Sequence, residues 1–94
     1  MGYALAPKQL VEHHMKVRFM YREKPDDPFD SGWRFFSGYK DDEYVNNPEN
    51  IGLFDIKSIS EIDPDVIPLI NNPLGTAFER ENEHSAFQVS KAFD

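Results

Sequence analysis

Residues 16–37 read KVRFMYREKPDDPFDSGWRFFS, and this stretch decides the fold class. In its first part, residues 16–23, Val17, Phe19 and Tyr21 share one face when the backbone is extended, because successive side chains of a strand point to opposite sides. Lysine, arginine and methionine side chains take the other face. This alternation predicts a half-buried β-strand.

The second part of the stretch continues with a loop and another strand. Two prolines, three aspartates, a serine and a glycine fall within residues 24–32, a composition typical of turns. Residues 33–37 then predict a strand in which Trp33 and Phe35 share one face. Arg34 points to the opposite face. One of the two faces belongs to the core, and the sequence leaves open which.

The rest of the chain adds short helices and further strands. The predicted elements are a helix over residues 8–15, a strand over 51–56, a short helix that begins at Asp63-Pro64, and a hairpin of residues 76–81 and 86–91. Ile56, Ile59 and Ile62 recur at helical spacing between the third strand and the second helix. Strands and helices that do not strictly alternate indicate a single α+β domain. We expect an antiparallel or mixed β-sheet with short helices packed on one face and a C-terminal β-hairpin.

Composition and charge restrict the compartment and the classes of partner. The 94 residues include no cysteine, so disulfides and thiolate metal ligands are excluded. No stretch has the apolar length of a signal peptide or a membrane span, and we expect a cytoplasmic protein. The net charge of −7 divides into +2 over residues 1–40 and −9 over residues 41–94. This acidity argues against nucleic acid and anionic membranes and favours a basic protein partner, although acidity also serves plain solubility.

No motif defines a catalytic centre, a metal site or a cofactor site. Ser31 lies in a turn-type Asp-Ser-Gly sequence without the GxSxG context of a serine nucleophile. His13 and His14 are adjacent and point apart, and His84 lacks HExxH spacing, so we expect surface histidines. The loops carry six carboxylates: Asp26, Asp27, Asp30, Asp41, Asp42 and Glu43. Their spacing matches no calcium loop, and we expect a protein without enzyme activity, with a small hydrolase that uses these carboxylates as the alternative.

An aromatic cluster marks the candidate partner-binding segment. Six of the thirteen aromatic residues fall between Phe29 and Tyr44, and Arg34 lies among them. Exposed aromatic and arginine side chains dominate the energetics of protein interfaces. The candidate partner-binding residues are Trp33, Arg34, Asp41, Asp42, Glu43 and Tyr44. For Trp33 the alternative is a place in the core, and for Arg34 both roles stay open.

Residues 21–56, followed by residues 63–80, resemble a bacterial family called immunity protein 33-like. The block DSGWRFFSG, residues 30–38, is the most distinctive part of the match. The matching positions are Arg22-Glu23, Asp30-Ser31-Gly32-Trp33-Arg34, Ser37-Gly38, Asp42-Glu43-Tyr44, Pro64, and Gly75 through Phe78-Glu79-Arg80. Those that we expect to be structural are Arg22, Asp30, Ser31, Gly32, Gly38, Gly75 and Arg80. The chain departs from the family at Tyr39-Lys40, and the match weakens after Arg80.

The resemblance implies a protein that neutralises a bacterial toxin by binding it, and it brings no catalytic residues with it. Together with the charge, it points to a basic toxin as the partner. We expect a monomer or weak homodimer. The alternative is a self-associating or regulatory binding module, because the edge of the predicted hairpin at residues 86–91 is unprotected.

Overall fold

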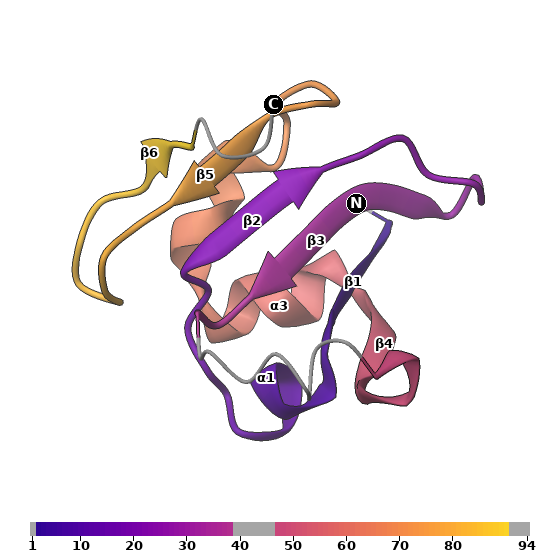
Figure 1. The fold of residues 1–94 in the computed structure, drawn as a ribbon, viewed down its shortest axis with the longest axis horizontal. Coiled ribbons are helices and arrows are strands. Elements are labelled where there is room, and N and C mark those ends of the chain that lie inside the picture. The colour runs from indigo at the N-terminus through magenta and orange to yellow at the C-terminus, as the bar shows by residue number, and fades with distance from the viewer. Residues whose placement is uncertain (1, 39–46, 91–94) are drawn as a thin grey trace.

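The chain forms one mixed β-sheet with its helices on one side (Figure 1). The computed structural model describes residues 2–38 and 47–90. The strands are β1 (Tyr3–Pro7), β2 (Phe19–Arg22), β3 (Asp30–Phe36), β4 (Ile51–Asp55), β5 (Ala77–Glu79) and β6 (Gln88–Val89). The helices are α1 (Lys8–Glu12) and α3 (Ile56–Ile62), with 3-10 helices η1 (Pro48–Asn50) and η2 (Pro64–Leu69). The strand order is β4-β1-β3-β2-β5-β6, with β1 and β3 parallel and the other pairs antiparallel, which confirms the predicted α+β fold.

β3 is a central strand, and it begins three residues before the predicted one. The turn composition of residues 30–32 predicts a loop, but Asp30 pairs with Tyr3 of β1, and the register shifts before the next pair, Leu5 with Arg34. The amide N–H of Gly32 donates to Asp30 Oδ1 at 2.9 Å, and the φ of Gly32 is 91°. The turn chemistry is therefore present, but it forms an irregularity inside the strand, as β-bulges do.

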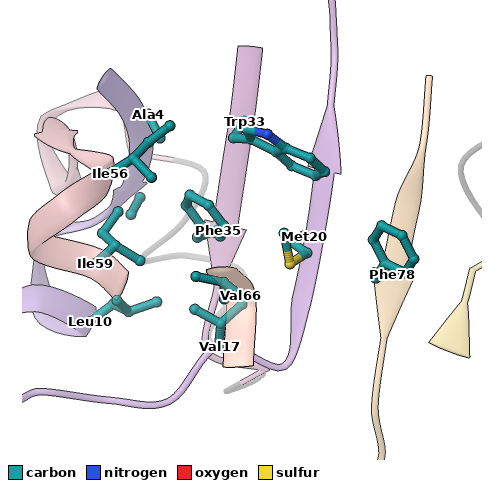
Figure 2. Packing of buried hydrophobic residues seen from close by; sticks show 11 residues of the cluster. Ala4, Leu10, Val17, Met20, Trp33, Phe35, Ile56, Ile59, Val66 and Phe78 are labelled. Atoms are coloured by element: carbon teal, nitrogen blue, oxygen red, sulfur yellow. The ribbon is translucent and has the colours of Figure 1, made fainter. Parts of the chain in front are cut away.

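β1 lies between β3 and β4 and is absent from the sequence-based prediction. Ala4 and Ala6 point into the core and are almost wholly buried, whereas Leu5 points to the opposite face, where it pairs with Leu53 of β4. Because both faces of this strand are apolar, no polar–apolar alternation marks it. The small side chain of Ala4 lies next to Ile56 of α3 (Figure 2).

α1 ends at Glu12, three residues before the end of the predicted helix over 8–15. The amide N–H groups of His14 and Met15 donate to the carbonyls of Val11 and Leu10 at 3.3 and 2.8 Å. His14 has a φ of 50°, in the left-handed region. This hydrogen-bond pattern is a Schellman motif, which terminates a helix.

β4 runs directly into α3. The amide N–H of Lys57 donates to Asp55 Oδ1 at 2.9 Å, so Asp55 caps the helix. The strand therefore ends at Asp55, one residue before the end of the predicted strand over 51–56. The helical spacing of the isoleucines places Ile56 and Ile59 in the core, as an amphipathic helix requires.

η2 follows α3 after one residue, and Asp63 caps it by accepting from the amide of Asp65 at 3.2 Å. The predicted helix start at Asp63-Pro64 is confirmed, but the segment is a 3-10 helix. Pro68 inside it has no amide hydrogen to donate, which favours a short, irregular turn of helix.

β5 and β6 form the predicted C-terminal hairpin, with Phe78 opposite Val89 and Glu79 opposite Gln88. Both strands are shorter than the predicted runs over 76–81 and 86–91. β6 keeps only two paired residues, and Phe87 before it turns inward to pack on the core.

The core lies between the sheet and the helices (Figure 2). Its largest fully buried side chains include Trp33 and Phe35 of β3, Met20 of β2, Leu10 of α1 and Val66 of η2. In the antiparallel pair of β2 and β3, Met20 is opposite Phe35, so Met20 and not the neighbouring aromatic residues points inward. The alternation predicts a strand over 16–23, and β2 forms within it, but Val17 lies in the core with Met20 and not on the face of Phe19 and Tyr21. The alternation also does not decide which face of β2 packs against the helices.

Candidate protein interface

The opposite face of the sheet is covered by no helix of the described residues, and we call it the open face. In Figure 1 it is turned toward the viewer, and α3 lies behind β3. Its side chains alternate along the strands with those of the core. The open-face residues include Leu5, Phe19, Tyr21, Glu23, Arg34, Phe36, Ile51 and Leu53.

Three aromatic rings form the centre of the open face. Phe19 and Tyr21 come from β2, and Phe36 comes from the end of β3. The ring centroids of Tyr21 and Phe36 lie 6.0 Å apart with an interplanar angle of 16°, and Phe19 lies 5.7 Å from Tyr21 and 6.2 Å from Phe36. All three side chains are half-buried. A rigid aromatic cluster that keeps part of its surface exposed suits a protein contact, because little conformational entropy is lost on binding.

Arg34 lies beside the aromatic cluster in a network of ion pairs. Its Nε donates to Glu23 Oε2 at 2.6 Å, and its Nη1 and Nη2 donate to Asp30 Oδ1 and Oδ2 at 2.9 and 2.8 Å. Nη1 also donates to the backbone carbonyl of Trp33 at 3.0 Å. The Arg34 side chain is 8% exposed, that of Asp30 12% and that of Glu23 46%. Arg34 is thus held by carboxylates of its own chain, and Glu23 presents most of the network to solvent.

The pKa values of Asp30, within this network, and of Tyr21, beside it, are shifted. The side-chain hydrogen bonds from Arg34 are the main reason that the pKa of Asp30 is lowered from its usual 3.8. The pKa of Tyr21 is raised from 10.0, first by burial and then by the negative charge of Glu23. Both shifts agree with an ionised Asp30 and a neutral Tyr21 at neutral pH.

Trp33, a candidate anchor in the sequence, is fully buried on the core side. Its Nε1 donates to the carbonyl of Ile70 at 2.8 Å, and its ring stacks 6.1 Å from Phe35. The guanidinium carbon of Arg22 lies 5.9 Å from the centre of the Trp33 ring. Of the two positions that the sequence left open for Trp33, the structure shows the one in the core, and the indole has no surface exposed to a partner.

The other candidate residues, Asp41, Asp42, Glu43 and Tyr44, lie outside the described residues. They follow Phe36, at the end of β3, within eight positions of the sequence. Phe19, Tyr21 and Phe36 lie on the open face, although the sequence did not indicate them as candidate interface residues. Their signal is that β3 carries aromatic side chains on both faces, although only one face of a strand can point to a single core.

Several of the family-motif residues contact the backbone of neighbouring segments. Arg22 Nε donates to the carbonyl of Ser31 at 2.9 Å, and its Nη1 donates to the carbonyl of Asn72 at 2.7 Å. Ser31 Oγ accepts from the amide of Trp33 at 3.1 Å. Gly75 donates its amide N–H to the carbonyl of Arg22 at 2.7 Å.

Two further glycines stand where a side chain would collide. A Cβ atom at Gly32 would lie 2.1 Å from the carbonyl oxygen of Glu23. A Cβ atom at Gly38 would lie 3.0 Å from the side chain of Arg18. Both glycines have positive φ angles, so the backbone conformation also favours glycine there.

Arg80 forms a second, deeply buried ion-pair network on the core side. Its Nη2 lies 2.5 Å from Asp63 Oδ2, its Nη1 lies 2.9 Å from Asp65 Oδ2, and its Nε donates to the carbonyl of Val17 at 2.8 Å. The guanidinium carbon also lies 4.2 Å from the ring centre of Phe87. This network joins β5, η2 and the segment before β2.

Within residues 2–38 and 47–90, no three histidine, aspartate or glutamate side chains gather where they could hold a metal ion. His13 and His14 are exposed, and His84 is exposed beside Glu83. Ser31 makes a turn-type hydrogen bond and no histidine appears among its hydrogen-bond partners there. No helix in the described part of the chain is long and apolar enough to cross a membrane.

In its described residues the structure is thus a small α+β domain, with one sheet face packed on helices and an aromatic cluster on the open face. Comparison with protein families gives a match to the model of the immunity protein Imm33 domain over residues 4–91. The chain belongs to this immunity protein family. Neither the curated proteins nor the solved structures contain a match to the chain.

Proposed function

We propose that the chain neutralises a protein toxin by binding it directly, with the open face at the centre of the contact. The family membership supports an immunity-type role. The observation that carries the binding mode is the half-buried cluster of Phe19, Tyr21 and Phe36 on strands of a rigid sheet. Partly exposed aromatic groups on a rigid frame are the kind of anchor that dominates protein interfaces.

Long-range attraction is the task that we assign to the acidic segment after β3. Asp41, Asp42 and Glu43 belong to the half of the chain that carries a charge of −9. A toxin that cleaves nucleic acid holds phosphate groups and so has a basic surface. Acidic groups then speed the encounter of the two proteins by long-range attraction, while the aromatic cluster and Tyr44 slow their dissociation.

Arg34 takes a positioning role in this proposal. With four hydrogen bonds to Glu23, Asp30 and the backbone of Trp33, it fixes the polar edge of the open face. The indole of Trp33 lies beneath and supports the strand from the core side. Neither residue has to contact the toxin itself.

Growth rescue tests the proposed function. Cells that express the toxin encoded beside this gene should stop growing, and co-expression of the chain should restore growth. Phe36→Ala, on the open face, should reduce the rescue and the affinity of the purified pair. Ile67→Ala on η2 is the matched control, because Ile67 is an exposed apolar side chain on the helical side of the molecule.

The outcomes separate three possibilities. If the wild-type chain neither binds nor protects against any neighbouring toxin, the toxin-neutralising function is wrong. If Phe36→Ala and Ile67→Ala lose the same affinity while both melt like wild type, the open face is not the contact. If light scattering gives a mass that grows with concentration and no toxin binds, the alternative of a self-associating module holds, although β6 offers only two residues to such pairing.

A further inference from the structure

The open face contains a small cavity next to its ion-pair network. Its volume is about 180 Å³. Its walls include Leu5, Tyr21, Glu23, Arg34, Phe36 and Ile51. Most of this lining is aliphatic or aromatic, and among the described residues that line the cavity Glu23 and Arg34 are the charged ones.

The network leaves one negative charge at this cavity. Arg34 carries one positive charge, and it contacts two carboxylates, those of Asp30 and Glu23. Asp30 accepts two hydrogen bonds from the guanidinium and is 12% exposed, so its charge is neutralised within the protein. Glu23 accepts through Oε2 and is 46% exposed. The surplus charge therefore reaches solvent at Glu23.

We propose that the cavity receives a single arginine or lysine side chain of the toxin, whose cationic end pairs with Glu23. This inference rests on the proposed function and adds the chemistry of the partner. The aliphatic stem of such a side chain would lie against Leu5, Ile51 and the rings of Tyr21 and Phe36. Long cationic side chains bury their stems on apolar surface in this way, and cations are attracted to aromatic faces.

The same features argue against other occupants. A purely apolar side chain would remove water from Glu23 without giving it a partner, which costs free energy. An anionic group would meet the surplus negative charge. A cation satisfies Glu23 by a charge-assisted hydrogen bond, and an arginine can do so while its plane stacks on an aromatic ring.

The test uses n-butylguanidinium chloride as a probe of the side chain, with amide shifts in two-dimensional NMR spectra as the readout. We expect saturable shifts at Tyr21, Glu23, Arg34 and Phe36. Equal concentrations of n-butanol and of sodium butyrate should leave these signals unchanged. Glu23→Gln keeps an oxygen for Arg34 Nε and removes the charge, and it should weaken probe binding about tenfold or more.

Asp26→Asn is the matched control, because it removes the same charge from an exposed position in the loop between β2 and β3. It should leave probe binding within about twofold of wild type, as expected of a solvent-screened charge. Thermal melting of both variants checks that each is folded. Probe shifts that do not saturate, or that persist in Glu23→Gln, would overturn the assignment.

The toxin itself provides the second arm. Glu23→Gln should raise the dissociation rate of the toxin complex by about tenfold, with Asp26→Asn close to wild type. A probe that binds the cavity while no toxin binds the chain would contradict the proposed function and leave the cation site standing. A toxin that binds Glu23→Gln as tightly as wild type would confirm the function and remove the cavity from the interface.

Discussion

The guanidinium of Arg80 and the carboxylate of Asp63 meet at 2.5 Å, and each side chain is only 1% exposed. Asp63 Oδ2 also accepts the amide N–H of Val17 at 2.8 Å, and Oδ1 accepts that of Asp65. One carboxylate therefore ties the hairpin, η2 and the entry to β2 together. A buried charge with this many partners contributes stability only while all of them are present.

Asp63→Asn should lower the free energy of unfolding by about 3–5 kcal/mol, because it leaves the buried charge of Arg80 without its main partner. Asp65→Asn is the control, since Asp65 contacts the same guanidinium but is 65% exposed. Its cost should be about 1 kcal/mol or less. Urea unfolding measures both. Equal losses in the two variants would show that the Arg80–Asp63 pair is not the stabilising contact.

Trp33→Ala should cost about 3–5 kcal/mol, as expected when a buried large aromatic side chain is removed. Trp33 is the single tryptophan of the chain, so its fluorescence reports on its surroundings without interference. We expect emission at short wavelength and little quenching by acrylamide in the folded protein. Strong quenching, or a melting temperature that Trp33→Ala does not change, would place the indole at the surface.

Gly32→Ala and Gly75→Ala form a matched pair. Their φ angles are similar, at 91° and 88°. An added Cβ at Gly32 would lie 2.1 Å from the carbonyl oxygen of Glu23, whereas an added Cβ at Gly75 would meet no such neighbour within 4 Å. Gly75→Ala should therefore cost only the conformational strain, about 1–2 kcal/mol. Gly32→Ala should cost clearly more, because β2 and β3 must move apart. Chemical unfolding of both variants gives the difference, and similar costs would contradict the close approach.

Asp30 should give the protein a pH-dependent stability term. Its pKa in the folded state is lower than the usual 3.8, mainly through its hydrogen bonds from Arg34. Folding thus favours the ionised form of Asp30. Its contribution to the free energy of unfolding is fully present above the pKa that Asp30 has in the unfolded chain, and it is lost as the pH falls through the pKa that Asp30 has in the folded protein. The difference in unfolding free energy between wild type and Asp30→Asn should shrink as the pH is lowered from about 4 toward 2. A difference that is constant over this range would contradict the ion pair.

Salt should slow association with a basic toxin. Raising the salt from about 0.05 to 0.5 M shortens the Debye length about threefold, so the association rate should fall steeply while the dissociation rate changes little. The triple variant Asp41→Asn, Asp42→Asn, Glu43→Gln should start from a lower association rate and depend less on salt. Stopped-flow or surface-based kinetics with the toxin measures both rates. A salt-independent association rate would remove electrostatic steering from the proposal.

The sequence was informative where side-chain chemistry repeats along the chain. Alternation predicted β2, the core of β3 and the terminal hairpin, and Asp63-Pro64 marked the start of η2. β1 stayed hidden because both of its faces are apolar. The same ambiguity affects β2, where Met20 competes with larger aromatic neighbours for the inward position. Its orientation depends on the pairing with Phe35, which sequence spacing alone does not reveal.

For the candidate interface, the sequence did not reveal which side of β3 each side chain faces. Trp33 and Arg34 are neighbours in β3, and their side chains reach opposite faces. Once Trp33 occupies the core, Arg34 and Phe36 must lie on the open face. The pairing of Arg34 with Glu23 is a contact between two strands, and it depends on the register of β2 against β3.

The position of β1 has a consequence for how the chain reaches its native state. β1 comes earliest of the six strands, yet both of its partners, β3 and β4, are made later. During synthesis on the ribosome β1 therefore stays without its full set of partner strands until β4 has emerged. Over that time its apolar side chains are accessible to chaperones and to other nascent chains. Such non-local pairing slows folding. A circular permutant that joins the old ends through a linker and opens the chain between α1 and β2 would make β1 after both of its partners, and we expect it to remove that wait.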